Sequence, residues 1–304
     1  MQAMAAAIQY GWHAAEPVLE VESGAEVSLE LRDASDGQVS PTDVETYRGG
    51  RFDGARGNPI TGPIRVVGAE PGDVLQVDVL DVKPGAWGWT GMAPGYGLLP
   101  GDFSRRDLLI WQIHDGIAET LGFRLPIHPF CGVLGVCPDG SGPHPVAPPR
   151  WVGGNLDVRQ LVAGATLYLP VALAGAWFGA GDAHARQGDG EVCGSAIEMP
   201  ASARLRLTVR RDLRLTTPAF DAPPDPHGRS RLYAVSGVDT DLFRAGQTAL
   251  RRLIEWIVAR YQVTPEQAYM LSSVLVDMRI SEVANPTWVV TACWPLDEVE
   301  RGAA

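Results

Sequence analysis

The sequence predicts a β-rich α/β (α+β) fold, with an N-terminal sandwich-like or barrel-like β part and a smaller C-terminal α/β part. Short alternating apolar segments, each following a glycine turn, recur through the first 215 residues. The 35 glycines and 24 prolines among 304 residues indicate many turns between short elements. Clear helical periodicity appears only after residue 239. We assign residues 1–215 to a β-rich domain and 216–304 to an α/β part, unless both form one domain.

The predicted strands differ in how many of their faces are apolar. Residues 203–209 alternate strictly, with Leu205, Leu207 and Val209 on one face, which is typical of a half-buried strand. The uncharged run 165–181 falls short of the ~20 apolar residues that a membrane-spanning helix needs. That run therefore predicts two buried strands. We predict strands at residues 26–31, 74–80, 166–171, 191–198, 203–209 and 288–294.

Two helices are predicted near the C-terminus. Apolar residues from Leu250 to Tyr261 recur at helical spacing and predict an amphipathic helix that begins near Asp239 or Thr240. Thr264 and Gln267 then form the pattern of a capping box, which starts a second helix. A proline-rich stretch at 221–229 and a glycine-rich stretch at 85–97 are predicted loops.

Composition excludes several classes of protein. The chain carries 25 Lys and Arg against 36 Asp and Glu, a net charge of −11, which argues against a nucleic-acid partner. An apolar content of 45% argues against disorder. The first residues lack a basic and apolar leader, so we expect a cytoplasmic protein with no membrane partner. The four cysteines form no CxxC pair and are expected to be packing residues.

Polar side chains suited to hard metal ions concentrate between residues 153 and 198. Asn155 and Asp157 are two residues apart, as are Asp182 and His184, so each pair shares a side of an extended segment. Glu191 follows a Gly-Asp-Gly turn. We predict Asp157, Asp182 and His184 as ligands of a divalent cation, with zinc favoured and calcium or magnesium as alternatives. The competing interpretation is that these carboxylates only bind backbone N–H groups in turns.

The other candidate site residues have less specific patterns. In a metal-assisted hydrolysis, Glu191 or Glu198 would carry the proton, and Asn155 or the cation would stabilise the oxyanion. Glu191 and Glu198 are seven residues apart, so in a regular strand they lie on opposite faces. Glu198 would then face another cavity, unless a β-bulge turns its side chain to the face of Glu191.

Substrate-binding candidates lie outside that segment. Trp87 and Trp89 in the 85–97 loop are candidates for a pocket wall, and packing over the sheet is the alternative. His128 precedes the glycine-punctuated apolar segment 129–136, where we expect backbone to approach another group closely.

Several of these blocks together resemble the acetamidase/formamidase family, from about Trp12 to Pro295. The resemblance rests on residues 58–63 (Asn-Pro-Ile-Thr-Gly-Pro), 68–73 (Gly-Ala-Glu-Pro-Gly-Asp), 129–132 (Pro-Phe-Cys-Gly), 153–157 (Gly-Gly-Asn-Leu-Asp), 181–191 (Gly-Asp-Ala-His-Ala-Arg-Gln-Gly-Asp-Gly-Glu), 196–198, 268–273 and 277–280. It implies a metal-containing homo-oligomeric enzyme that hydrolyses a small carboxamide to acid and ammonia. Formamide, acetamide, other short amides and lactams are all within what the resemblance implies.

Two other functions stay open at the level of sequence. A non-catalytic β-protein would bind a small ligand through the tryptophan loop. A cysteine-dependent amidase would use Cys193, which is two residues from Glu191 and close in sequence to His184. No Gly-x-Ser-x-Gly, GxGxxG or Walker-type loop is present, so serine-hydrolase and nucleotide-binding functions are not supported.

Overall fold

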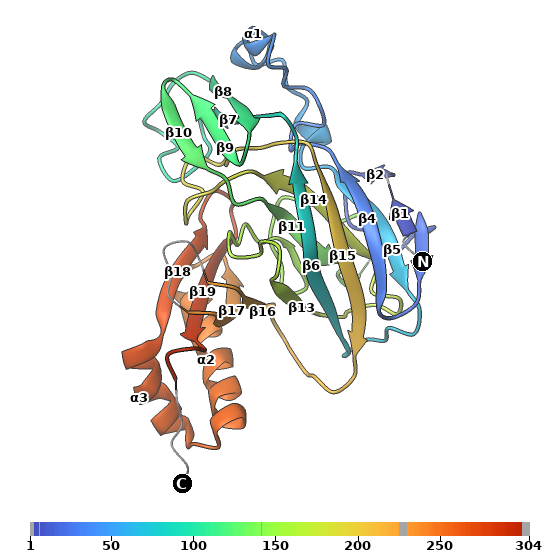
Figure 1. Cartoon of the computed structure of the whole chain (residues 1–304), viewed down its shortest axis with the longest axis vertical. Helices are drawn as coiled ribbons and strands as arrows, with labels where there is room; N and C mark the ends of the chain where they lie inside the picture. Colours follow the sequence, from blue (N-terminus) through green and yellow to red (C-terminus); the bar gives the residue numbers. More distant parts are fainter. Residues whose placement is uncertain (1–2, 6, 141, 225–229, 300–304) are drawn as a thin grey trace.

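Two large sheets pack face to face in the computed structural model, which describes residues 3–5, 7–140, 142–224 and 230–299 (Figure 1). The larger sheet has nine strands, and each strand is hydrogen-bonded to its neighbours in the spatial order. In spatial order they are β1 (Ala3–Ala5), β4 (Ala25–Leu31), β15 (Ala201–Arg210), β6 (Val74–Pro84), β13 (Thr166–Pro170), β16 (Ala219–Ala222), β17 (Leu232–Asp239), β19 (Trp288–Pro295) and β18 (Asp277–Glu282).

A six-stranded sheet faces it, and a four-stranded sheet lies at one end. The six strands are β12 (Gly153–Asn155), β11 (Phe130–Val136), β14 (Phe178–His184), β5 (Ile60–Val66) and β2 (Ile8–Gln9), with β3 (Leu19–Val21) paired to β5. The four strands are β10 (Phe123–Pro126), β9 (Ile117–Thr120), β8 (Asp107–His114) and β7 (Trp87–Met92). A short helix, α1 (Val44–Arg48), and a 3-10 turn (Gly54–Arg56) precede β5.

Both large sheets contribute to one apolar core. Alternate residues of β4, such as Val27 and Leu29, are fully buried and belong to the same cluster as Leu205 of β15 and Ile64 of β5. Alternation with period two directs one face of each sheet inward, which is how two sheets bury a shared layer. The β-rich α+β fold class predicted from the sequence is therefore confirmed.

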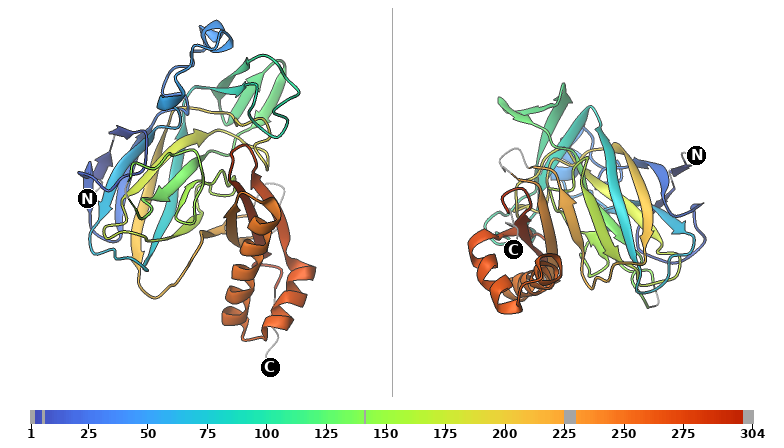
Figure 2. Two further views of the ribbon diagram at one scale, coloured as in Figure 1. Left: turned by 180° about the vertical axis from the view of Figure 1, so that it is seen from behind. Right: turned by 60° about the horizontal axis from the view of Figure 1, so that its bottom comes forward.

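The C-terminal helices cover one part of the nine-stranded sheet (Figure 2). Helix α2 (Leu242–Tyr261) packs Leu253 and Ile257 on Tyr233 of β17 and Trp294 of β19. It begins after Asp241, whose carboxylate accepts a hydrogen bond from the Arg244 N–H, so its start lies slightly beyond the predicted one.

The second helix is α3 (Pro265–Leu275). The predicted capping box between Thr264 and Gln267 is present, with both reciprocal hydrogen bonds. No helix in the described part of the chain is long and apolar enough to cross a membrane.

The predicted division at residue 215 falls inside a continuous sheet. Strand β16, after that point, pairs with β13, before it, through Thr166–Asp221 and two further residue pairs. Residues 225–229 of the predicted proline-rich loop lie outside the described residues. The division into a β-rich domain, 1–215, and an α/β part packed on it, 216–304, stays a prediction.

Three segments differ from the sequence prediction. Strand β7 lies inside the stretch predicted as a loop at 85–97, because its glycines hide the alternation of Trp87 and Trp89. Residues 191–198 form turns and an isolated bridge instead of a strand, since Glu191 has a left-handed φ of 45°. Strand β18 follows α3 directly, in a stretch where no strand is predicted from the sequence.

Candidate active site

Neighbouring strands bring together the acidic and imidazole side chains predicted from the sequence. His184 ends β14 and is paired with Phe130 of β11, and β11 also pairs with β12, which ends at Asn155. Asp157 follows β12 by two residues, and Glu198 forms an isolated bridge with His184. Antiparallel pairing of β14, β11 and β12 therefore places ends that are distant in sequence side by side.

His184 is the centre of this cluster and is fully buried. Its Nε2 atom lies 3.1 Å from Oε2 of Glu198, 3.4 Å from Oδ1 of Asp182 and 4.0 Å from Oε1 of Glu191. Its Nδ1 atom lies 4.0 Å from Oδ1 of Asp157. Two overlapping groups could each hold a metal ion, Asp157–His184–Glu191 and Asp182–His184–Glu198. Within each group, the possible ligand atoms lie within 4.8 Å of one another.

Three of the carboxylate residues adopt an uncommon backbone conformation. Asp157, Asp182 and Glu191 have φ values of 49°, 54° and 45°, in the left-handed region that non-glycine residues seldom enter. Such strain persists where the surrounding structure imposes it, and it concentrates at functional sites. The extended geometry expected for both pairs is accordingly interrupted, at Asp157 and at Asp182, although Oδ1 of Asp182 still lies 3.4 Å from Nε2 of His184.

Glycine at position 132 makes the convergence sterically feasible. A Cβ atom there would lie 2.4 Å from Oδ1 of Asp157 and 2.9 Å from Cε1 of His184. Any larger residue would have to displace the cluster, so β11 requires glycine at this point. The expectation that backbone in segment 129–136 approaches another group closely is confirmed.

Gln187 determines which imidazole nitrogen faces the carboxylates. Its Nε2 donates to the carbonyl oxygens of Asp157, at 2.7 Å, and Ser281, at 3.3 Å. Its Oε1 must therefore accept the hydrogen bond from Nδ1 of His184, at 2.9 Å. Nε2 of His184 is left directed at Asp182 and Glu198, the arrangement in which an outer hydrogen bond orients a metal-binding histidine.

Burial and mutual repulsion shift the pKa values of these groups. Burial raises the pKa of Asp157 well above its usual range, and the charges of Glu191 and Asp182 add to the rise. Burial likewise raises the pKa of Glu191 well above its usual range and that of Glu198 to about 7. Burial alone would lower the pKa of His184, but the Glu198 and Asp182 carboxylates raise it well above its usual value.

Asp182 is the exception among the carboxylates. Burial favours its neutral form, yet the positive charge of His184 and hydrogen bonding to His184 and Glu198 together outweigh that effect and lower the pKa of Asp182. One carboxylate is thus held ionised while its neighbours are driven towards protonation, a divergence that is typical of functional sites.

The donor set fits a divalent cation. Both carboxylate oxygens of Asp157, Oδ1 of Asp182, Nε2 of His184 and Oε2 of Glu198 are buried and make no hydrogen bond among the described residues. Buried polar atoms without partners are costly, and several carboxylates around one imidazole carry excess negative charge. Imidazole with carboxylates is a ligand set that suits zinc and related divalent ions.

The cluster opens onto a cavity of 410 Å³. Asn155, Asp182, Glu191 and Glu198 line it, while Asp157 lies behind them and does not. Glu198 is held in place, because its Oε1 accepts hydrogen bonds from Ala196 N, at 2.7 Å, and Ser195 Oγ, at 3.2 Å. Glu191 and Glu198 therefore line one cavity. The turn at Glu191 interrupts the predicted strand, so the two side chains no longer lie on opposite faces of a strand.

Of the predicted substrate-binding residues, Trp89 lines this cavity and Trp87 and His128 do not. The Trp89 backbone exchanges hydrogen bonds of 2.9 and 2.8 Å with Glu198, which fixes its strand against the cluster. Trp87 lies two residues earlier on β7 and packs against the apolar cluster that contains Tyr47 and Trp89. His128 lines a separate cavity of 260 Å³ beneath the start of β11.

Cys193 also lines the 410 Å³ cavity but is poorly suited to nucleophilic attack. Burial raises the pKa of its thiol, and its sulfur faces the carbonyl oxygen of Ser195, at 3.4 Å. The thiolate is the nucleophilic form, so this environment disfavours a cysteine mechanism.

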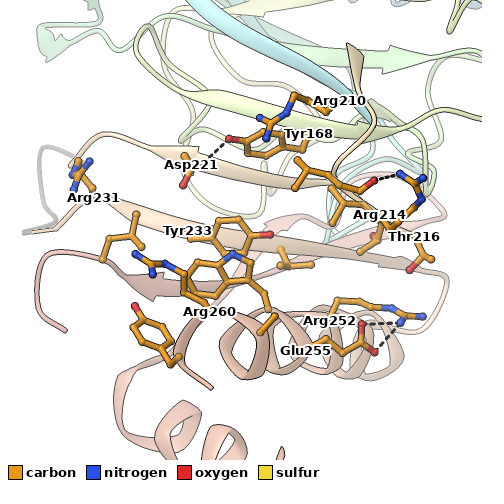
Figure 3. A pocket seen from close by; sticks show the side chains of 18 of the residues that line it. Tyr168, Arg210, Arg214, Thr216, Asp221, Arg231, Tyr233, Arg252, Glu255 and Arg260 are labelled. Carbon is orange, nitrogen blue, oxygen red and sulfur yellow. Dashed lines mark hydrogen bonds and ion pairs between the residues drawn. The ribbon is translucent and has the colours of Figure 1, made fainter. Parts of the chain in front are cut away.

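A larger cavity, of 1130 Å³, lies between α2 and the nine-stranded sheet (Figure 3). Its polar groups are largely paired within the chain: Arg252 lies 2.8 Å from Glu255, and the Tyr168 hydroxyl donates to Asp221 at 2.8 Å. Among its lining residues that the structure describes, none has a buried side-chain atom without a hydrogen-bond partner like those around His184. The smaller cavity is therefore the candidate active site.

Sequence reasoning missed two residues beside the cluster, Gln187 and Glu282. Gln187 lies three residues after His184, but an uncharged amide in that segment has no pattern that marks it as the partner of Nδ1. Glu282 is brought in by the bridge of its backbone with Gly190, which is distant in sequence. Asp189 was expected to be a turn residue, and it anchors the loop through ion pairs with Arg159, at 2.8 Å, and Arg279, at 3.0 Å.

Glu282 supplies a stability prediction. Burial raises the pKa of Glu282 from 4.5 to about 7. The folded state therefore holds a proton that the unfolded state releases, and the unfolding free energy declines as pH rises from about 4.5 to about 7. In metal-free protein, Glu282→Gln should remove about 3 kcal/mol of this decline. Denaturant unfolding across pH would measure it, with the exposed Glu298→Gln as control. An unchanged pH slope in Glu282→Gln would contradict the assignment.

Comparisons with known proteins agree with this geometry. The sequence pattern of the Acetamidase/Formamidase family matches residues 1–143 and 142–300. A formamidase of Methylophilus methylotrophus is 28% identical over 283 residues, covering 70% of this chain and 67% of that protein. An acetamidase of Mycolicibacterium smegmatis is 30% identical over 258 residues, covering 62% of each.

A solved structure shares the whole architecture. The crystal structure of an acetamidase from Yersinia enterocolitica superposes with a TM-score of 0.90 at 27% identity, covering 99% of this chain and 94% of that one. The family match spans nearly the entire sequence, including every residue of the cluster around His184. The chain belongs to the acetamidase/formamidase family of amide-hydrolysing enzymes.

Proposed function

We propose that the chain hydrolyses a small carboxamide to a carboxylate and ammonia in the 410 Å³ cavity, with the aid of a divalent cation. The observation that carries this proposal is the set of buried ligand atoms around His184, beside that cavity, that make no hydrogen bond among the described residues. Asp182, Glu198 and Nε2 of His184 would hold the cation, zinc in first place. Asp157 belongs to the overlapping group with His184 and Glu191 and would be a further ligand. The cation would supply Lewis-acid polarisation of the carbonyl and a lowered pKa of water.

Glu191 is the best-placed proton carrier. It faces the cavity, makes none of the side-chain hydrogen bonds that hold Glu198, and has a raised pKa. Water attacks the carbonyl carbon, Glu191 accepts a proton from it, and that proton passes to the nitrogen as the C–N bond breaks. Amide nitrogen leaves only when protonated, so a carboxyl group with a raised pKa suits both transfers. Asn155 lines the cavity and can donate an N–H to the developing oxyanion.

The direct test combines elemental analysis with ammonia release. Purified protein should contain about one divalent cation per chain and should release ammonia from formamide, acetamide or another short amide. Chelation should abolish the release, and added zinc should restore it. Activity that survives complete metal removal would contradict the metal-dependent part of the proposal, and the absence of release from every amide would contradict hydrolysis itself.

Cys193→Ser separates this mechanism from a thiol nucleophile. The serine variant should keep ammonia release within about twofold of the unmodified protein, because the raised thiol pKa gives Cys193 little nucleophilic character. Steady-state rates measured with and without an alkylating reagent provide the comparison. Loss of activity in the variant, together with resistance to chelation, would favour the cysteine mechanism.

The assembly is a further part of the proposal. A homo-oligomer is what the family resemblance implies. Light scattering on the purified protein would measure the number of subunits.

A further inference from the structure

The 410 Å³ cavity is larger than formamide or acetamide requires. Pockets of about 300–1,000 Å³ bury ligands of drug size, whereas these two amides have only three and four non-hydrogen atoms. Side chains of Tyr47, Phe52, Trp89 and Tyr96 line the space beyond the carboxylates. A larger substrate would therefore extend from the cluster along an aromatic wall.

Arg106 is the cation among the described residues that line this cavity. It is half-buried, immediately before β8, and its guanidinium carbon lies 5.6 Å from the Tyr47 ring centroid. The adjacent Asp107 is already paired with Arg48, at 2.9 Å. Among the described residues Arg106 forms no ion pair, although guanidinium groups in partly buried sites usually have a carboxylate partner.

Contacts along the wall separate Arg106 from the acidic cluster. Tyr47, which Arg106 covers, has its ring centroid 6.1 Å from that of Trp89. Trp89 is in turn hydrogen-bonded through its backbone to Glu198. The cavity is therefore lined by both signs of charge, with the carboxylates in the His184 cluster and the guanidinium of Arg106 over Tyr47.

We propose that the substrates of this chain are amides that carry a carboxylate remote from the scissile bond, and that Arg106 binds that carboxylate. The inference rests on the proposed amide hydrolysis. Arg106 binds the anionic end of the molecule, so its neutral amide end is left to face Glu191. The intervening carbon chain lies against Tyr47 and Trp89.

The test uses ω-amide monocarboxylates of increasing length, namely succinamate, glutaramate and adipamate, each paired with the alkyl amide of the same chain length without the carboxylate. The metal-loaded protein should prefer the best of the three over its neutral counterpart by at least about 10-fold in kcat/KM. Arg106→Met should lower kcat/KM for that substrate by about 10- to 100-fold, mainly through KM, since a charged hydrogen bond is lost. Rates with the neutral amide should stay within about threefold.

Arg105→Met is the matched control, because Arg105 is the exposed neighbour and does not line the cavity. It should leave both rates unchanged. A wild-type preference for the neutral amides, or an equal loss on both substrates in Arg106→Met, would overturn the role of Arg106 while hydrolysis itself stands. Failure of the metal-loaded protein to release ammonia from any amide would instead overturn the proposed function, and this inference with it.

Discussion

Replacing Glu191 with glutamine is expected to reduce kcat by about 100- to 10,000-fold, the range in which a positioned general acid–base group contributes. Glutamine keeps the size and hydrogen-bonding capacity of the side chain but cannot carry the proton. Glu191 faces the cavity, whereas Glu198 is fixed by hydrogen bonds from Ala196 and Ser195. The loss should therefore appear in kcat with little change in KM.

Metal content distinguishes this role from a ligand role. Glu191→Gln should retain the cation measured in the unmodified protein, and its thermal unfolding should be little altered. Steady-state ammonia release and elemental analysis on the same preparation provide both readouts. Near-normal turnover would contradict the assignment of Glu191 as the proton carrier, and loss of the cation would show that it is a ligand instead.

Replacing Asp182 with asparagine is expected to weaken cation binding by at least about 100-fold and to abolish turnover at limiting metal. Asp182 is the carboxylate whose pKa is lowered, so it is the one held ionised beside Nε2 of His184. Loss of its charge removes the strongest electrostatic attraction at the site, and mutations in the groups around a metal commonly cost 10- to 100-fold even when they are not ligands.

The same variant should lower stability, and more so when zinc is present. In metal-free protein the lowered pKa of Asp182 means that its charge stabilises the fold through His184, so Asp182→Asn should unfold at a lower denaturant concentration than the unmodified chain. With zinc present the difference should widen, because the unmodified chain gains more from ligand binding. Titration calorimetry gives the affinity. An unchanged affinity for zinc would contradict a ligand role for Asp182.

Part of the candidate site was predictable because its residues are close in sequence. Asp182 and His184 are two residues apart at the end of one strand, and the structure places them 3.4 Å apart as the spacing indicated. The Gly-Asp-Gly turn marked Glu191 for the same local reason. Trp87 and His128 were weaker candidates because nothing local ties them to this segment, and neither lines the cavity.

Other features depend on contacts that no local pattern encodes. Gln187 orients His184 only because its amide meets the carbonyl oxygens of Asp157 and of Ser281 on another strand. Arg106 joins the cavity because α1 and β8 pack against each other. The left-handed backbone conformation of Asp157 and Glu191 changes the direction of both side chains. At Glu191 it also begins a turn where the sequence predicts a strand over 191–198.

The sequence by itself determined the β-rich class, the two late helices with their caps, and the identity of the acidic and imidazole groups, because period-two alternation, helical spacing and capping are local properties of the chain. Tertiary structure alone decided which carboxylates open onto the cavity, which nitrogen of His184 faces them and where the opposite charge of Arg106 lies. Those facts follow from strand pairing and burial across more than a hundred residues, where desolvation and proximity, rather than spacing, set the chemistry.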